Sequence, residues 1–411
     1  MNIFTKAQLV AHLIRWRLTW DKRDTRWKYT RPDNPKFMGV RDAVGKIADG
    51  AVVAISGLAG NQRSSFVYWT IRELFQETGH PRDLTIVSIG GHGGRGKIPG
   101  TIEELGLEGL CTRFITGHSE TYKSILRLAD KGHCELQIIP QGTLALLLGA
   151  LAKGEDCVIN DTGVGTFMDP RTGRGTPVVG DYPQLVEALE DGRLKYTCPK
   201  IDVAIFNAPA ADKKGNIYVK GAAMVGETWP IAKAAKRNGG FVIANVAKVV
   251  EEGYSGIYLP ADDIDAVVVW PETEQSASVK HRKMWPFLAL GSTFPIDEGV
   301  ARVKFLNTLL GITPVRKPID DALARLAASI FVENAKKGDY VDIGVGLPEE
   351  VSRLLFHSGA MHDVTLLNES GVFGGLPTPG VFFGAAVNPE EIISSTEAFE
   401  RVAKESQLAE A

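Results

Sequence analysis

The chain has 411 residues, of which 44% are hydrophobic and 23% are charged, and its formal net charge is −3 at pH 7. This length suggests two or three domains, and the composition is that of an ordinary globular protein. The net charge provides no overall positive potential that would attract nucleic acid, and no apolar run reaches the ~18 residues of a membrane span. We therefore expect neither nucleic acid nor a membrane as a partner.

The cysteines and histidines show no pattern of a metal site. The eight histidines form no ligand cluster, and the four cysteines contain no C-x-x-C pair. Spread-out cysteines are typical of free thiols in a reducing compartment. The N-terminus also lacks the long apolar stretch and small-residue cleavage site of a signal peptide. We expect a cytoplasmic protein without a bound metal.

The first part of the chain divides into an arm and an α/β domain. Residues 1–37 form an N-terminal arm that mixes Trp, Arg and Lys. The arm either packs on the protein's own surface or binds a partner or an anion. In residues 38–270, Val/Ile-rich runs alternate with helical patterns, which predicts a mostly parallel sheet covered on both faces. The predicted strands are AVVAISG (51–57), DLTIVSIGG (83–91), CTRFITG (111–117), CELQIIP (134–140), IDVAIFNA (201–208), GGFVIANVAKVV (239–250) and AVVVW (266–270).

The pattern pauses and then restarts. Residues 271–317 lose the α/β rhythm and are predicted to be a connector. Residues 318–411 begin again with a helix, the strand VDIG, a glycine turn, a helix and the strand DVTLL, which leads into Glu369. The segment DVTLLNESG matches DLTIVSIGG in place. This internal echo suggests two related domains.

One glycine motif is a decoy. The segment GHGGRGK (91–97) fits G-x-G-x-x-G and nearly fits a phosphate-binding loop. However, Ile98 stands where Ser or Thr should bind magnesium, and Pro99 and Gly100 interrupt the helix that should hold a pyrophosphate. A mobile glycine loop near a site fits better than a dinucleotide site.

Six segments in order resemble the class I (glutamate-type) CoA-transferases, most closely the propionate/acetate branch with both subunit types fused. They are QGTLALLL (141–148), TGVGTFMDPRTGRG (162–175), IDVAIFNAPAADKKGNIYV (201–219), VDIGVGLPEEV (341–351), NESGVFGG (368–375) and FGAAVNPEEII (383–393). The resemblance implies two related, open, mostly parallel-sheet α/β domains of the NagB-like kind. The first, alpha-like domain is then 38–270, and the beta-like domain begins at 318 and is incomplete in this chain.

The resemblance also implies an activity. The chain would transfer CoA from an acyl-CoA to a carboxylic acid, such as acetate or propionate, by a ping-pong mechanism through a glutamyl-CoA thioester. Coenzyme A would be a substrate, with no permanently bound cofactor. Two alternatives stay open, namely an acyl-CoA hydrolase on the same scaffold and a non-catalytic subunit of a CoA-transferase assembly.

Residue roles follow from the matched motifs. Glu369 is the expected nucleophile, and Gln141, at the carboxyl end of a predicted strand, is the expected oxyanion donor. Asn368 is expected to hydrogen-bond the Glu369 carboxylate. Arg63, in an unusual first loop, either pairs with an acceptor carboxylate or caps the following helix. The expected CoA- or substrate-binding residues are Gly57, Asn61, Gly344, Gly346, Gly371, Gly374 and Gly375.

The restarted domain is short for an independent fold. It has fewer than a hundred residues and two or three clear strands, which would leave an open sheet edge. We therefore expect a homo- or hetero-oligomer, with either a second chain that completes the domain or a truncated reading frame.

Overall fold

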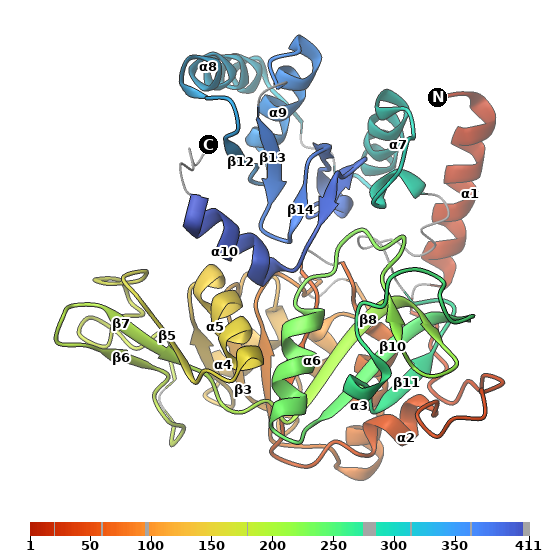
Figure 1. The fold of residues 1–411 in the computed structure, drawn as a ribbon, viewed down its shortest axis with the longest axis vertical. Coiled ribbons are helices and arrows are strands. Elements are labelled where there is room, and N and C mark those ends of the chain that lie inside the picture. Colours follow the sequence, from red (N-terminus) through yellow and green to blue (C-terminus); the bar gives the residue numbers. More distant parts are fainter. Residues whose placement is uncertain are drawn as a thin grey trace. The chain divides into compact units, whose positions relative to one another are not determined.

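A computed structural model of the chain describes residues 1–19, 21–58, 61–94, 98–178, 180–273, 285–312, 315–361 and 364–405. These residues form two compact units, which we describe separately (Figure 1). Described residues within 21–219 and 226–274 belong to unit 2, and those within 1–20, 220–225 and 275–411 belong to unit 1.

Unit 2 is built on an eight-stranded sheet. Its strand order is β11-β10-β8-β1-β2-β3-β4, each neighbouring pair on this path is parallel, and β9 pairs antiparallel with β8. Near-continuous apolar strands are buried on both faces, so the predicted parallel sheet is confirmed. The strands are β1 (Val52–Ile55), β2 (Leu84–Ser88), β3 (Cys111–Thr116), β4 (Glu135–Ile138), β8 (Val203–Asp212), β9 (Ile217–Tyr218), β10 (Phe241–Val250) and β11 (Ala266–Val269).

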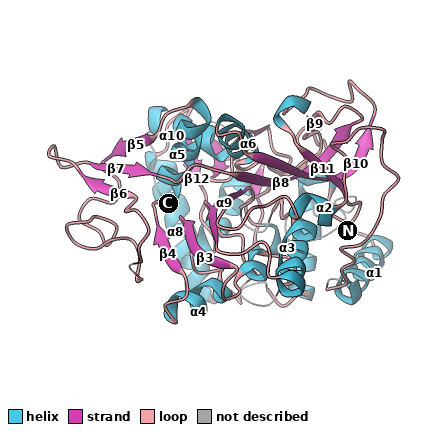
Figure 2. Cartoon of the chain, turned by 90° about the horizontal axis from the view of Figure 1, so that it is seen from below, coloured by secondary structure: helices cyan, strands magenta, loops and turns pink. Residues whose placement is uncertain are grey.

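Helices cover both faces of this sheet. Apolar side chains of α2, α3 and α4 share one core cluster with the strands, and α5 and α6 pack together on the other face (Figure 2). The helices are α2 (Val40–Val44), α3 (Ser65–Thr78), α4 (Lys123–Asp130), α5 (Gln141–Lys153) and α6 (Thr228–Arg237), with 3-10 turns η1 (Ile102–Leu105) and η2 (Ala261–Asp263). The ends of the parallel strands therefore remain as the part of the sheet open to ligands.

A small antiparallel sheet is inserted after α5. Its strand order is β5-β7-β6, and the TGVG motif lies in the long segment that joins its first two strands. In that segment a salt bridge of 2.6 Å to Arg171 holds the pKa of Asp169 well below its ordinary value. The strands are β5 (Cys157–Asn160), β6 (Val186–Ala188) and β7 (Leu194–Thr197).

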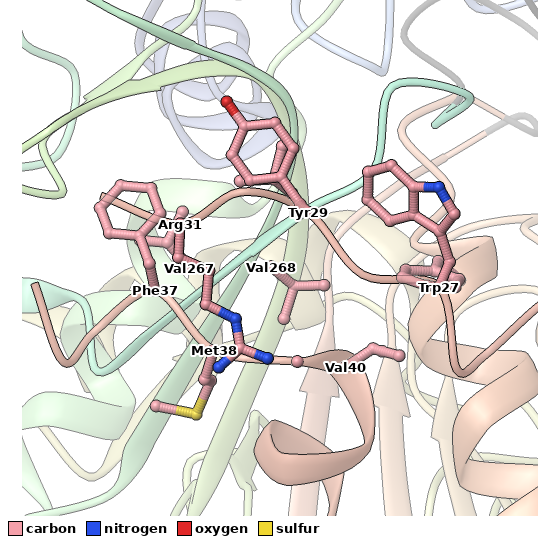
Figure 3. Close-up of a pocket in the computed structure, with 11 residues that line it drawn as sticks. Trp27, Tyr29, Arg31, Phe37, Met38, Val40, Val267 and Val268 are labelled. Carbon is pink, nitrogen blue, oxygen red and sulfur yellow. The ribbon is translucent and has the colours of Figure 1, made fainter. Parts of the chain in front are cut away.

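The β11 edge of the large sheet is covered by the end of the N-terminal arm. The Val267 N–H donates to the Lys36 carbonyl at 2.7 Å, and the Met38 N–H donates to the Val267 carbonyl at 3.3 Å. Phe37, Tyr29 and Val267 line a cleft at this crossing whose volume is only about 10 Å³ (Figure 3). The arm thus blunts an exposed sheet edge and leaves room for about one water molecule.

Unit 1 contains a smaller, mixed sheet. Its strand order is β12-β13-β14-β17; β12 and β13 are parallel, and the other two pairs are antiparallel. The parallel pairing predicted for this domain is limited to one pair because the chain reverses in a tight turn directly after β13. The strands are β12 (Tyr340–Asp342), β13 (Thr365–Asn368), β14 (Val372–Phe373) and β17 (Glu391–Ile392), with a separate hairpin of β15 (Leu376–Pro377) and β16 (Ala386–Val387).

The helices of unit 1 come from both ends of the chain. Leu9, Leu13 and Trp16 of α1 share a core cluster with Val303 and Leu306 of α7, so part of the predicted arm and part of the predicted connector pack in this unit. No described helix is both long and apolar enough to cross a membrane. The helices are α1 (Ile3–Thr19), α7 (Ile296–Leu309), α8 (Pro318–Asn334), α9 (Leu347–Ser358) and α10 (Ser395–Glu405), with 3-10 turns η4 (Pro286–Leu288) and η5 (Gly380–Phe382).

The echo noticed in the sequence is a structural repeat. The segment β1-α3-β2 in unit 2 and the segment β12-α9-β13 in unit 1 each form a parallel pair with a helical crossover. Val52 stands opposite Thr85 in the first pair, and Tyr340 stands opposite Thr365 in the second. Both threonine N–H groups donate to the carbonyl one residue before that position. Each unit is thus a version of one βαβ plan, and the β13 terminus that carries Glu369 corresponds to the β2 terminus.

Candidate functional site

Glu369 is the first residue of a tight hairpin turn. The turn residues Glu369, Ser370 and Gly371 join β13 to β14, and the Gly371 N–H donates to the Asn368 carbonyl at 3.1 Å. Gly371 has a φ of 87°, the left-handed conformation that closes a three-residue hairpin loop. The strand therefore fixes the backbone of Glu369.

Asn368 stabilises this turn through its side-chain oxygen. Its Oδ1 accepts a hydrogen bond from the Ser370 N–H at 3.2 Å, the usual asparagine turn geometry. The Ser370 hydroxyl also contacts Oδ1 and lies 2.6 Å from the Gly384 carbonyl. These contacts engage the Oδ1 acceptor of Asn368, and a hydrogen bond from its Nδ2 to the Glu369 carboxylate stays a prediction.

The Glu369 carboxyl is held in a poorly solvated environment. The side chain is half-buried, and burial raises the pKa of Glu369, while the residue's own backbone N–H opposes that rise. Glu369 forms no ion pair with a described Lys, Arg or His. Desolvation disfavours the charged form of a carboxyl group. An unneutralised carboxylate of this kind is well suited to attack an electrophile.

The three glycines after Glu369 have packing roles. A Cβ on Gly371 would lie 2.2 Å from the Ile393 carbonyl, one on Gly374 would lie 2.6 Å from the Glu390 side chain, and one on Gly375 would lie 2.3 Å from the Val387 carbonyl. All three also have positive φ. Close backbone packing explains Gly371 and Gly375, a side-chain contact explains Gly374, and contact with CoA stays a prediction for all three.

This packing predicts a stability difference between two glycines of similar conformation. Gly375 has a φ of 70°, and Gly311, also in unit 1, has a φ of 67° with nothing within 4 Å of a Cβ added to it. Gly311→Ala should cost about 1 kcal/mol of unfolding free energy, whereas Gly375→Ala should cost about 3 kcal/mol because its Cβ meets backbone. Both losses of unfolding free energy can be measured by urea unfolding, with hydrogen exchange of the β13 amides as the probe. Equal losses would contradict the packing role.

The Gly344 and Gly346 loop presents an open backbone. Gly344 is exposed, Gly346 has a φ of 108°, and no atom lies within 4 Å of a Cβ built on Gly346. Gly346 is the N-cap residue of α9, whose first turn carries Glu349. Burial raises the pKa of Glu349 to about 7, against the opposing effects of the Gly346 N–H and Arg316. The open backbone makes this loop the better glycine candidate for a ligand contact in unit 1.

A cavity of about 390 Å³ lies between α7, α8 and α9. Its arginines are engaged within the unit: Arg316 donates to the Gly346 carbonyl at 2.8 Å, and Arg353 pairs with Glu350. We assign these two arginines no part in CoA binding, because they already bind groups of the same unit.

In unit 2, Gly57 and Asn61 lie after β1, at the switch point of the sheet, where the strand order reverses. The chain runs from β1 to β2 on one side, and β8 pairs with β1 on the other. Ligands of open α/β sheets bind at the carboxyl ends of strands at such a point. The Gly57 N–H donates to Glu227 Oε2 at 3.2 Å, and a Cβ on Gly57 would lie 2.7 Å from the Asn61 carbonyl. The structure thus brings these two predicted residues together.

Buried polar residues surround this loop, of which the sequence had singled out only Arg63. Glu227, His92 and Arg63 are at most 1% exposed. Burial, together with the Arg63 charge, lowers the pKa of His92 to about 3, so its imidazole is neutral at physiological pH. The N-cap of α3 is Ser64, so Arg63 precedes that position and does not cap the helix. The sequence signal available for this cluster was a polar residue directly after a predicted strand, as with His92 after residues 83–91.

Gln141 lies where the carboxyl ends of three neighbouring strands converge. It is the first residue of α5, separated from the end of β4 by Ile139 and Pro140, and the residue is half-buried. A Cβ on Gly117, which follows β3, would lie 2.5 Å from Gln141 Cα and 2.7 Å from the carbonyl of Ile89, which follows β2. Gly117 therefore lets the Gln141 backbone approach the centre of the sheet edge.

Two further points concern the GHGGRGK segment and metal binding. Residues 95–97 of the GHGGRGK segment lie outside the described residues, and the next described helix is the 3-10 turn η1. Among the described residues, no group of three His, Cys, Asp or Glu side chains is arranged to hold a metal ion.

Comparisons with known proteins agree with this geometry. The family model "Coenzyme A transferase" matches residues 37–269. The chain is 30% identical to caffeate CoA-transferase of Acetobacterium woodii, covering 89% of this chain and 67% of that protein. It is 27% identical to acetate CoA-transferase YdiF of Escherichia coli strain K12, covering 88% and 66%. The chain thus spans about two thirds of the length of these relatives.

A solved structure shows the same likeness. The thioester complex of acyl-CoA transferase YdiF from Escherichia coli O157:H7 with CoA matches with a TM-score of 0.72 and 25% identity, covering 90% of this chain and 66% of that chain. The family model over residues 37–269 and the 30% identity to caffeate CoA-transferase, together with the parallel sheet, show that the chain belongs to the class I coenzyme A transferase family.

Proposed function

We propose that this protein transfers coenzyme A from an acyl-CoA to a carboxylic acid, with Glu369 as the nucleophile. One observation carries the proposal: a glutamate, fixed by a hairpin turn at the end of β13, whose pKa is raised by burial and which forms no ion pair with a described cation. Family membership supports the same activity. The CoA thioester complex of YdiF supports coenzyme A as the group that is carried.

The proposed chemistry needs no proton transfer at its first step. A Glu369 carboxylate oxygen attacks the thioester carbonyl carbon, the carbon–sulfur bond breaks, and a mixed anhydride and CoA thiolate form. The thiolate then attacks the glutamyl carbonyl, which expels the first carboxylate and leaves a glutamyl-CoA thioester. An acceptor carboxylate enters and the steps run in reverse. Covalent catalysis of this kind predicts ping-pong kinetics.

Hydrogen-bond donors would stabilise the tetrahedral intermediates. We assign the oxyanion to the Gln141 side-chain amide and to a backbone N–H, because preorganised donors are worth roughly 3–4 kcal/mol each in such sites. The Gly344–Gly346 loop would contact CoA. The switch-point residues Gly57 and Asn61 would line the acyl or acceptor pocket, and the adjacent buried Arg63 would shape it.

Acids of short chain length are the proposed substrates. One similar protein is named for acetate and the other for caffeate, and both names denote carboxylic acids. We propose acetate or propionate as the acceptor. A substrate panel should therefore contain acetate, propionate and caffeate.

The test follows CoA rather than the acid. Intact-mass spectrometry after incubation with acetyl-CoA should show a covalent CoA adduct, and addition of propionate should remove the adduct with formation of propionyl-CoA. Free CoA released at the same rate without any acid would instead identify a hydrolase. No adduct, either with the chain alone or after its extension by the relatives' additional third, would overturn the proposal and favour a non-catalytic subunit.

A further inference from the structure

The proposed function leaves the cavity between α7, α8 and α9 without a role. Its volume of about 390 Å³ is in the range of small-molecule binding sites. Well-packed protein interiors contain few voids larger than a water molecule. The cavity walls come from these three helices and from the β15–β16 hairpin, all within unit 1. The fold of unit 1 therefore provides a space that can hold a ligand.

Much of the cavity lining is apolar. Val303 of α7, Leu376 of β15 and Val387 of β16 are at most 4% exposed and line the cavity from two sides. Val300 and Leu354 extend this aliphatic surface and are half-buried. Because burial of apolar surface stabilises a complex in proportion to its area, a ligand that fills this space needs an apolar body.

The lining also contains four carboxylates, of which only Glu349 lacks a described partner that neutralises it. Glu349 lies in the first turn of α9 and forms no ion pair with a described Lys, Arg or His. The other three already bind groups of the unit, namely Asp320 the Lys317 N–H at 2.8 Å, Asp321 the Arg325 guanidinium at 2.9 Å and Glu350 the Arg353 guanidinium.

The cations of the lining do not change this picture. Arg316 donates to the Gly346 carbonyl at 2.8 Å and lies 3.6 Å from Glu350, and Arg353 pairs with that same Glu350. Lys304 is exposed. Burial raises the pKa of Glu349 to about 7; the Gly346 N–H and Arg316 oppose this rise, and Glu350 adds to it. A carboxylate that is desolvated but not neutralised is stabilised most by an external cation.

We propose that this cavity binds a small organic cation, a protonated amine on an apolar body, whose ammonium group pairs with the Glu349 carboxylate. The aliphatic lining would hold the apolar body. An anion fits less well, because Arg316 and Arg353 already bind groups of the unit. The inference goes beyond the proposed function and does not depend on it, since the ligand is neither an acyl-CoA nor an acid and no proposed reaction step involves Glu349.

The experiment measures binding to the full chain in the absence of acyl-CoA and acid. Isothermal titration calorimetry compares hexylamine, hexanol and hexanoate, which share one apolar body and differ in the head group. Hexylamine should bind at one site per chain and at least about 10-fold more tightly than the other two, because only its head group pairs with a carboxylate. In protein labelled with ¹⁵N-glycine, hexylamine should shift the Gly346 amide, which donates to Glu349, but not that of Gly338, which lies outside the lining.

The affinity for hexylamine should also depend on pH. Only the ionised Glu349 carboxylate pairs with the ammonium group, so affinity falls as pH falls through the pKa of about 7. Between pH 5.5 and pH 8.5 the affinity should therefore rise about 30-fold. The alkylammonium group stays charged over this interval, because its pKa is close to the value of about 10.4 for lysine.

Two matched pairs of variants locate the ligand. Glu349→Gln should weaken hexylamine binding at least about 10-fold and remove its pH dependence, whereas Glu298→Gln, on α7 outside the lining, should change neither. Val300→Trp should fill the cavity and abolish binding. Val315→Trp makes the same exchange at a position that is 89% exposed and outside the lining, and it should leave binding intact.

Three results would overturn the proposal. The first is binding of hexanol or hexanoate as tight as that of hexylamine, which would show that the head group does not pair with Glu349. The second is unchanged hexylamine affinity in both Glu349→Gln and Val300→Trp. The third is competitive displacement of hexylamine by free CoA, which would make the cavity part of the CoA site.

Discussion

Replacement of Glu369 by glutamine should abolish the covalent CoA adduct and lower the transfer rate on the order of 10³-fold or more. The neutral carboxamide is a poor nucleophile toward a thioester, and it lacks the negative charge of the carboxylate. The hairpin should persist, because the turn is held by the Gly371 N–H and by the Asn368 side chain rather than by Glu369 itself.

Mass spectrometry distinguishes a loss of chemistry from a loss of folding. Borohydride reduction of the acyl-CoA-treated protein should modify the peptide that contains Glu369. The control is Glu298→Gln, which removes a unit 1 carboxyl on α7 that pairs with Arg302 at 2.7 Å and which should keep the adduct. An undiminished adduct in Glu369→Gln, or modification of a different peptide, would sink the assignment.

The same site predicts a pH dependence. The pKa of Glu369 is raised above its ordinary value by burial, and only the ionised carboxylate attacks. The rate of adduct formation should therefore increase with pH through that raised pKa and level off above it. A rate that falls over the same interval would show that a protonated group limits the reaction.

Replacement of Gln141 by alanine should lower kcat by roughly 10²–10³-fold, the usual effect of removing one oxyanion donor. Gln141→Glu should lose as much activity, although its shape is retained, because an ionised carboxylate only accepts hydrogen bonds and would repel the oxyanion. Steady-state transfer kinetics with a fixed acyl-CoA and acid measure both variants.

Gln137 provides the control for this prediction. It lies on β4, close to Gln141 in sequence, but its side-chain Nε2 donates to the Arg174 carbonyl at 3.2 Å and the residue is 3% exposed. Gln137→Ala should therefore reduce stability while the folded fraction keeps its kcat. Near-normal kcat in Gln141→Glu would exclude the donor role.

The pattern of residues along the chain was sufficient to locate the local elements and the ends of the strands. Val/Ile runs bounded by glycine located the parallel strands of unit 2, since strands buried on both faces consist of nearly continuous apolar residues. The same pattern placed Gln141 after β4 and Glu369 after β13. The similar sequences of residues 83–91 and 363–371 predicted the repeated βαβ plan.

Which residues meet became evident only from the packing of distant segments. Gly371, Gly374 and Gly375 were expected to leave space for CoA, but each meets groups from residues 387–394 that local periodicity does not connect to them. Likewise, α1 joins the core of unit 1, the end of the arm covers β11, and Arg63 lies buried near His92. Such contacts depend on how distant segments pack, because hydrophobic burial is non-directional and the alternation of residues sets only a segment's own faces.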